Sequence, residues 1–272
     1  SSKYLFGQLM FAEIKTHGVS GTITLNDPER GNCLDAMGLL QFQQALEDLR
    51  QEKSIRGIII TGSGNYFSTG TDLLALSRQM KSDPLDRNNS DLEILVEVLL
   101  AMIRYPKPIV SALNGPALGN GAAIALAADI VIGCNATSIG FPEVARGLVA
   151  SFAAVMLRMR LGRSAIAPML LTGESLNAKQ AYELGLVQEV VDSDLTWARS
   201  HEIIEAMNDT SPQAAQLTRK VLYETLSNSI ETDLRSACGT AATARFTLSA
   251  CEGVSAFVDN RKSDWDDAYS GE

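Results

Sequence analysis

The stretch NGPALGNGAAIALAADIVIGC, at residues 114–134, decides the fold. It opens as a glycine-rich loop, continues as a run of small apolar residues that favours a closely packed helix, and ends in the apolar residues 130–134. The apolar residues 108–113 (PIVSAL), directly before it, predict a buried strand. A strand, a glycine-rich loop, a helix and a second strand in this order indicate a parallel α/β unit.

The same order occurs earlier in the chain. Residues 55–61 (IRGIIIT) predict a buried strand, residues 62–72 (GSGNYFSTGTD) form a glycine-rich loop, and a helix is expected to begin at Leu73. Before this unit, the alternating residues 11–16 and 21–26 predict a hairpin. Two strand, loop and helix units in one chain predict an α/β fold with a mainly parallel sheet.

The last third of the chain has a different character. A strand is expected at residues 186–191, and helical patterns fill the rest. We therefore predict an α/β core domain over residues 1–205 and a helical section over residues 206–272. The helices of this section carry apolar faces that so small a section could not bury by itself, which suggests that it joins subunits.

Composition excludes several classes of protein. The chain has 272 residues, of which 46% are hydrophobic and 20% charged, which is typical of a globular enzyme-sized protein rather than a disordered or fibrous one. Its net charge of −9, with no basic stripe, argues against a nucleic-acid partner. No window approaches the about 18 consecutive apolar residues of a membrane span, and the first residues do not resemble a secretory signal. We expect a cytoplasmic protein with no membrane partner.

The sequence also lacks the motifs that are typical of metal sites, disulfide scaffolds and hydrolases. The four cysteines are far apart and form no CxxC pair, so a zinc ribbon or a disulfide scaffold is not expected. There is no HExxH or EF-hand pattern, and we predict no metal site. The two histidines, His17 and His201, accompany no GxSxG elbow, and the glycine loops match neither GxGxxG nor the P-loop spacing.

The two glycine loops remain as candidates for chemistry. Backbone N–H groups at the start of a helix have no partner within the helix and lie in its positive field. Two such loop ends, at Gly70-Thr71 and at residues 119–121, would form an oxyanion hole if they converged. A pair of amides suits the enolate of a thioester better than it suits a phosphate. The alternative is that the glycines only permit tight turns and close packing.

Glu143 is the candidate general base. It follows the apolar residues 139–142 (IGFP), so it stands at the end of an expected buried segment. Burial disfavours the charged form of a carboxyl group and raises its pKa toward the range in which a base works at neutral pH. The alternative is a solvated glutamate in a turn after Pro142.

Several motifs together resemble the crotonase superfamily of enoyl-CoA hydratases and isomerases, and they cover nearly the whole chain in the family's order. They are FSTGTDL (67–73), NGPALGNGAAIALAADIVIG (114–133), FPEVARGLV (141–149), LTGESLNAKQAYELGLVQEVV (171–191) and CEGVSAFVDNRKSDW (251–265). The resemblance implies a spiral of ββα units with a helical C-terminal trimerisation section. It also implies a homotrimer or a dimer of trimers, and an acyl-CoA thioester as substrate, so that coenzyme A belongs to the substrate and no separate cofactor is expected.

The resemblance also implies roles for single residues. The family's first oxyanion donor falls on the backbone N–H of Thr71, which follows Gly70. Its second donor is the middle residue of a Gly-Gly-Gly run, which is Asn120 between Gly119 and Gly121 here. The three glycines would support the two amides.

The catalytic and CoA-binding positions match only in part. One of the family's two catalytic glutamates corresponds to Glu143, but Ala123 stands in place of the other, and Leu74 replaces an early lysine. Lys262 matches a basic position near the CoA phosphates. One base suffices to move a double bond, so the departure at residue 123 favours Δ3-Δ2 enoyl-CoA isomerisation through a thioester enolate. Hydration with a single glutamate, as in some branched-chain members, is the alternative, followed by a non-catalytic acyl-CoA-binding scaffold.

Overall fold

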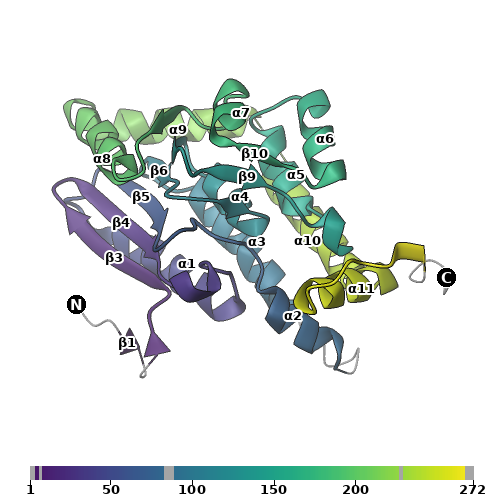
Figure 1. Cartoon of the computed structure of the whole chain (residues 1–272). Helices are drawn as coiled ribbons and strands as arrows, with labels where there is room; N and C mark the ends of the chain where they lie inside the picture. Colours follow the sequence, from purple (N-terminus) through teal and green to yellow (C-terminus); the bar gives the residue numbers. More distant parts are fainter. Residues whose placement is uncertain (1–3, 6–7, 83–88, 227–228, 267–272) are drawn as a thin grey trace.

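A six-stranded sheet organises the first two thirds of the chain in this computed structural model, which describes residues 4–5, 8–82, 89–226 and 229–266 (Figure 1). The strands lie in the order β11-β8-β6-β5-β4-β3. The hairpin pair is antiparallel and every other neighbouring pair is parallel, which confirms the predicted mainly parallel sheet. Their bounds are β3 Ala12–His17, β4 Ser20–Leu25, β5 Gly57–Gly62, β6 Ile109–Ala112, β8 Ile130–Cys134 and β11 Glu189–Val191.

A smaller sheet, which the sequence did not predict, stands beside the large one. Strand β9 (Ser138–Gly140) lies in its centre, parallel to β7 (Ala117–Leu118) and antiparallel to β10 (Ser175–Asn177). Strands of two or three residues are too short to show a period of two in the sequence. The remaining strands, β1 (Tyr4–Leu5) and β2 (Gln8–Leu9), pair with each other near the start of the chain.

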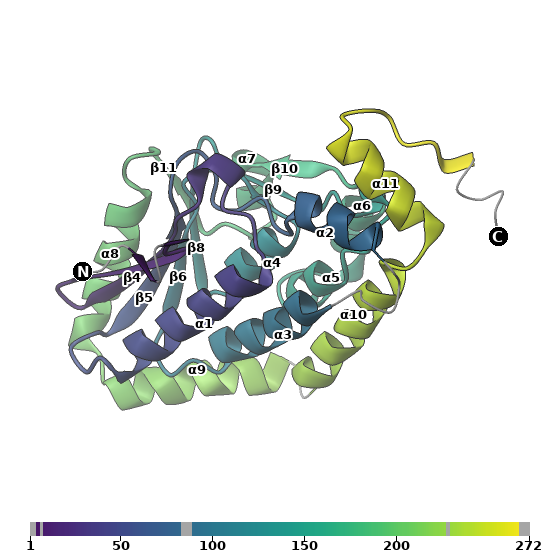
Figure 2. The same ribbon diagram turned by 90° about the horizontal axis from the view of Figure 1, so that it is seen from below.

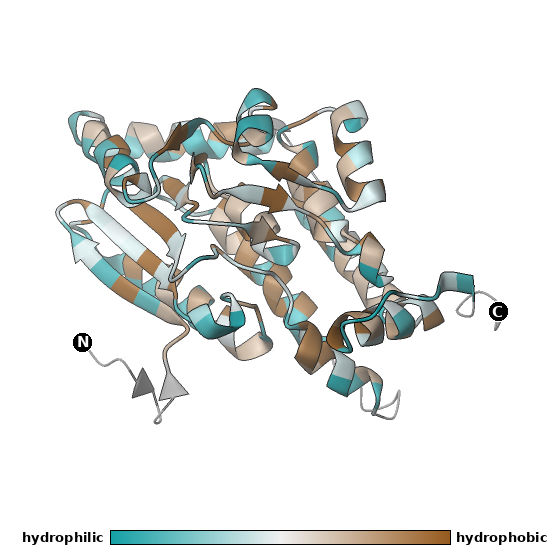
Figure 3. Cartoon of the chain, in the orientation of Figure 1, coloured by the Kyte–Doolittle hydropathy of each residue, from teal (hydrophilic) through white to brown (hydrophobic). Residues whose placement is uncertain are grey.

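Helices cover both faces of the large sheet. Helix α1 (Ala36–Gln51) and helix α3 (Ser90–Ile103) run side by side over one face, and α8 (Thr196–Ala206) packs on the other (Figure 2). Asp35 caps α1, because its side chain accepts a hydrogen bond from the N–H of Gly38. The strands carry hydrophobic residues between these layers (Figure 3), which is why the sheet reads as continuous apolar runs.

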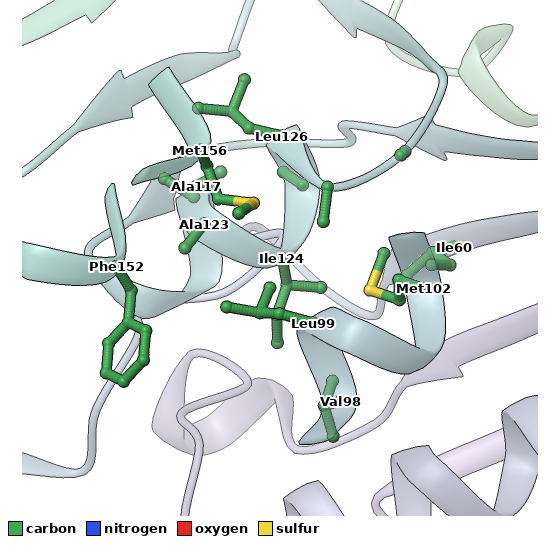
Figure 4. Close-up of a cluster of buried hydrophobic side chains, with 14 of the residues drawn as sticks. Ile60, Val98, Leu99, Met102, Ala117, Ala123, Ile124, Leu126, Phe152 and Met156 are labelled. Atoms are coloured by element: carbon green, nitrogen blue, oxygen red, sulfur yellow. The ribbon is translucent and has the colours of Figure 1, made fainter. Parts of the chain in front are cut away.

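The helix after the second glycine loop lies in the centre of the core. In α4 (Asn120–Leu126), every residue from Gly121 to Leu126 is buried. It packs against α5 (Ser151–Arg158), and the buried side chains around it include Leu99, Phe152 and Met156 (Figure 4). The residues of this helix are therefore mostly small, because the helix is enclosed on all sides. The other described helices before α8 are α2 Leu73–Met80, α6 Arg163–Thr172 and α7 Ala178–Glu183.

The C-terminal section is helical, as predicted, and it packs closely on the rest of the chain. It comprises α9 (Pro212–Leu226), α10 (Ile230–Ala244) and α11 (Leu248–Val258). Helix α10 contacts α3 and α5, and α11 contacts α2 (Figure 2). Helix α9 exposes several apolar side chains, which agrees with an assembly surface. The domain boundary at residue 205 and the trimer both stay predictions.

The described residues contain neither a candidate membrane-spanning helix nor a candidate metal site. None of the helices in these ranges combines the length and the apolar character that a membrane crossing requires. Likewise, no group of three or more His, Cys, Asp or Glu side chains in the described part of the chain is placed to hold a metal ion.

Candidate active site

The two glycine loops lie side by side. The N–H of Leu118 in the second loop donates to the carbonyl of Ser68 in the first, at 2.9 Å. The approach is close at Gly70, where an added Cβ would stand 2.6 Å from the carbonyl oxygen of Leu118 and 3.1 Å from the amide nitrogen of Asn120. Only glycine permits this approach, since real Cβ atoms do not come so close to a backbone. The structure thus brings together the two loops that the sequence singled out.

The amides of Thr71 and Asn120 are both left without an acceptor. Leu34 donates to the carbonyl of Gly70 and accepts from the N–H of Asp72. The N–H of Thr71, between these two residues, takes part in neither hydrogen bond. Asn120 is the first residue of α4, where a helix offers its N–H no partner. Neither amide donates to any residue that the structure describes. Both are therefore available to an oxygen atom of a ligand.

Gly119 and Gly121 shape the second loop around these amides. Gly119 has φ 53° and ψ −127°, a backbone conformation that side chains disfavour. A Cβ there would also stand 2.8 Å from Oε1 of Glu143. At Gly121 it would stand 2.6 Å from the Cβ of Ser68. These glycines allow close packing and also leave the two amides open, and the oxyanion hole itself stays a prediction.

Glu143 points its carboxyl group at this loop. It follows strand β9 and begins a short 3₁₀ turn at Val144–Arg146. Its Oε2 atom is buried and has no hydrogen-bond partner among the described residues. Burial raises the pKa of Glu143 to about 7, although its own backbone N–H and the charge of Arg146 act in the opposite direction. The alternative of a solvated turn glutamate does not fit this buried carboxyl group.

A narrow cavity of about 30 Å³ connects these groups. Its wall combines the two amide residues, the glutamate and apolar side chains: Thr71, Leu92, Asn120, Glu143, Leu148, Val149, Phe152, Ala241 and Arg245. Among these described lining residues, Glu143 is the only carboxylate. A base beside two free amides in a largely apolar cavity can remove a proton next to a carbonyl group and stabilise the resulting enolate.

A second small cavity, of about 70 Å³, lies next to the first and shares Thr71 and Arg245 with it. Arg245 forms a two-pronged ion pair with Asp91, with distances of 2.7 and 2.6 Å between its nitrogens and the carboxylate oxygens. This pair joins the end of α10 to the start of α3 beside the candidate site. Sequence reasoning missed it, because 154 residues separate the partners.

Ala123 and Leu74, which differ from the family's residues, and Lys262, which matches a basic position of the family, lie in different surroundings. Ala123 is fully buried among hydrophobic side chains of the core (Figure 4), so no carboxylate stands at this point of α4. Leu74 is exposed on α2. Lys262 is exposed beyond the end of α11 and lines neither of the two small cavities, so its contact with CoA stays a prediction.

Two other features prove to be separate from this site. A larger groove, of about 840 Å³, lies between the end of α3 and helices α9 and α10, and it contains none of the residues around Glu143. A hydrogen bond of 2.7 Å joins Nδ1 of His201 to the hydroxyl oxygen of Ser20, a contact that the sequence did not reveal. The Ser20 hydroxyl is fully buried, so a substrate cannot reach it as a nucleophile.

The comparisons with known proteins agree with this geometry. Residues 15–268 match the family model described as enoyl-CoA hydratase/isomerase. A curated relative, the 2,3-dehydroadipyl-CoA hydratase of Escherichia coli, is 30% identical over 244 residues, which are 89% of this chain and 93% of the relative.

Solved structures give the same result. An enoyl-CoA hydratase/isomerase from Mycobacterium paratuberculosis superposes with a TM-score of 0.83 at 26% identity, covering 90% of this chain and 98% of that one. A monofunctional enoyl-CoA isomerase from Mycobacterium smegmatis gives 0.68 at 28% identity, covering 82% and 98%. The fold is therefore the crotonase fold, and this chain belongs to the enoyl-CoA hydratase/isomerase family of enzymes.

Proposed function

We propose that the protein isomerises 3-enoyl-CoA to 2-enoyl-CoA thioesters, with Glu143 as its single base. The thioester oxygen would bind between the amides of Thr71 and Asn120. Glu143 would take a proton from C2, the electron pair would move into a dienolate held by the two amides, and the same proton would return at C4. One carboxyl group carries the proton in both steps, so atoms and charge balance without a second acid.

The observation that carries this proposal is the single carboxylate in the cavity wall. Hydration of a 2-enoyl thioester needs a water molecule that is both positioned and activated, a task for which the two-glutamate hydratases of this family use both carboxylates. Ala123 leaves only a methyl group where the second would stand, and that methyl group is enclosed in the core.

Hydration by Glu143 alone is the second candidate. The specific observation in its favour is the naming of relatives, since the Escherichia coli relative is a 2,3-dehydroadipyl-CoA hydratase. In this scheme Glu143 would deprotonate the attacking water, and the enolate would again form between Thr71 and Asn120. A scaffold that binds acyl-CoA without turnover is the third possibility.

A substrate panel separates the three. The purified protein is assayed with 3-enoyl-, 2-enoyl- and 3-hydroxyacyl-CoA thioesters of matched chain length, and both the position of the double bond and the gain of water are followed. We expect 3-enoyl-CoA to be converted faster than 2-enoyl-CoA is hydrated. Efficient hydration without 3-enoyl turnover would reject isomerisation in favour of hydration, and binding without any turnover would indicate the scaffold.

A further inference from the structure

The two residues with free amides are also joined through their side chains. Nδ2 of Asn120 donates a hydrogen bond to Oγ1 of Thr71 at 2.9 Å, across the line where the two glycine loops meet. A threonine hydroxyl has one proton to donate and lone pairs that accept. Because Oγ1 accepts from Asn120, its own proton is left for another acceptor, and no described residue provides one.

The space around Thr71 leaves a ligand as that acceptor. Thr71 lines both small cavities, and Asn120 and Glu143 line one of them with it. The hydroxyl group and the free N–H group belong to the same residue, so both can approach one oxygen atom in the cavity. The Oε2 atom of Glu143, which lines the same cavity, is buried, so bulk water does not surround this carboxyl group.

We propose that the Thr71 hydroxyl is a third hydrogen-bond donor to the thioester oxygen of the substrate, and that the Asn120 side chain positions it. The proposal rests on the acyl-CoA chemistry proposed above. It assigns a function to the two side chains at positions where the backbone alone would have sufficed. Thr71 is then a catalytic residue through its hydroxyl, and the Asn120 side chain is a positioning group.

The effect is expected on the chemical step. When Glu143 takes a proton from the substrate, negative charge moves from its carboxylate to the thioester oxygen. A donor aimed at that oxygen becomes stronger as the charge develops, so it stabilises the transition state more than the bound substrate. Loss of the hydroxyl should therefore lower kcat and leave KM nearly unchanged.

The first test measures the hydrogen bonds without any turnover. Butanoyl-CoA, labelled with ¹³C at its thioester carbonyl, is bound to the protein and its carbonyl stretch is recorded by infrared difference spectroscopy. Hydrogen bonds to a carbonyl oxygen lower this frequency. We expect a higher frequency in Thr71→Val than in wild type, and a return toward the wild-type value in Thr71→Ser. Thr69→Val, which alters a hydroxyl in the same loop that bonds to the carbonyl of Arg30, is the matched control.

Asn120→Ala tests the direction of the side-chain hydrogen bond. If Asn120 donates to Thr71, its removal only loosens the hydroxyl, and the carbonyl frequency rises slightly. If the amide were turned over, Thr71 would donate to the oxygen of Asn120, and removing that oxygen would free the proton and lower the frequency. A lower frequency in Asn120→Ala would overturn the proposal.

Kinetics of the same variants provide the second test. Thr71→Val should lower kcat by about 10- to 10²-fold, the scale of one hydrogen bond to a developing charge. Thr71→Ser should recover most of this loss. Asn120→Ala should lose less, and the double variant should be no worse than Thr71→Val alone, because both act through one hydroxyl.

The outcomes distinguish this proposal from the function on which it rests. A bound carbonyl band that stays unchanged in Thr71→Val and in Thr71→Ala would overturn the third donor and leave the acyl-CoA function intact. A kcat that is equal in wild type, Thr71→Val and Thr71→Ala would also overturn the third donor and leave the acyl-CoA function intact. A complete lack of butanoyl-CoA binding by wild type would overturn both together. Thermal unfolding of each variant shows whether it is folded, and Thr71→Ala replaces Thr71→Val if the latter is not.

Discussion

Asp129 and Glu143 are two acids in contrasting surroundings. Asp129 accepts hydrogen bonds from Nε of Arg219 at 2.8 Å, from the N–H of Ile109 at 2.7 Å and from the Tyr223 hydroxyl at 3.1 Å. In Glu143, the buried Oε2 has no hydrogen-bond partner among the residues that the structure describes. A carboxyl group that is surrounded by donors holds segments together, whereas one that is buried without a partner can take up a proton. Under the proposed function, Asp129 serves the fold and Glu143 serves the chemistry.

Glu143→Gln should give the largest effect on activity. Glutamine keeps the shape of the side chain but cannot accept a proton, so kcat should fall by about 10²- to 10⁴-fold, the range for loss of a general base. Acyl-CoA binding should change little, because the amides of Thr71 and Asn120 remain. Steady-state kinetics and calorimetric titration with a saturated acyl-CoA measure the two quantities. Full turnover by the variant would refute the role of Glu143 under either proposed reaction.

Asp129→Asn should lower the stability of the protein rather than its activity. Arg219 is buried, and it also donates to the carbonyls of Met102, Ile103 and Tyr105 at the end of α3. Removal of its counter-charge leaves a buried cation, and we expect the free energy of unfolding to fall by about 3 kcal/mol. Denaturant titration measures this change.

The matched control is Glu97→Gln, which breaks the exposed pair between Glu97 and Arg235. Exposed ion pairs contribute little, so this variant should unfold like wild type. Asp129 lines neither small cavity, so the kcat of Asp129→Asn should stay near that of wild type. A variant of normal stability with impaired kcat would reverse the roles that the comparison assigns to the two acids.

Local patterns were enough to predict the framework and to bring the residues of the candidate site to attention. The apolar runs at 55–61 and 108–113 each correspond to a strand of the large parallel sheet, and the glycine loops that follow them meet. Glu143 was found because an apolar segment stands directly before it. In each case the signal lies within about ten consecutive residues, where the period of the chain and the special freedom of glycine are visible.

Contacts between distant segments could not be predicted in this way. The ion pair of Arg245 with Asp91 and the hydrogen bond of Asn120 with Thr71 join residues that are far apart in the sequence. A polar residue in an otherwise small-residue loop was the only signal for the second contact. The solvation of Glu143 was also open, since the sequence shows an apolar neighbour but not whether water reaches the carboxyl group.

The pH dependence gives the smallest and most specific prediction for the same comparison. With a pKa of about 7, Glu143 is protonated in acid and cannot act as a base, so kcat/KM should rise with pH up to about 7 and then level off. One pH unit below this pKa, the activity should be about tenfold lower, since only about a tenth of the base is ionised.

Stability should change with pH in the opposite direction to activity. Between the ordinary glutamate pKa of 4.5 and about 7, the folded protein holds a proton that the unfolded chain has lost, so the free energy of unfolding falls as the pH rises through this range. Both slopes should shrink in Glu143→Gln and persist in Asp129→Asn. If the slope of stability were the same in wild type and Glu143→Gln, the raised pKa would belong to another group.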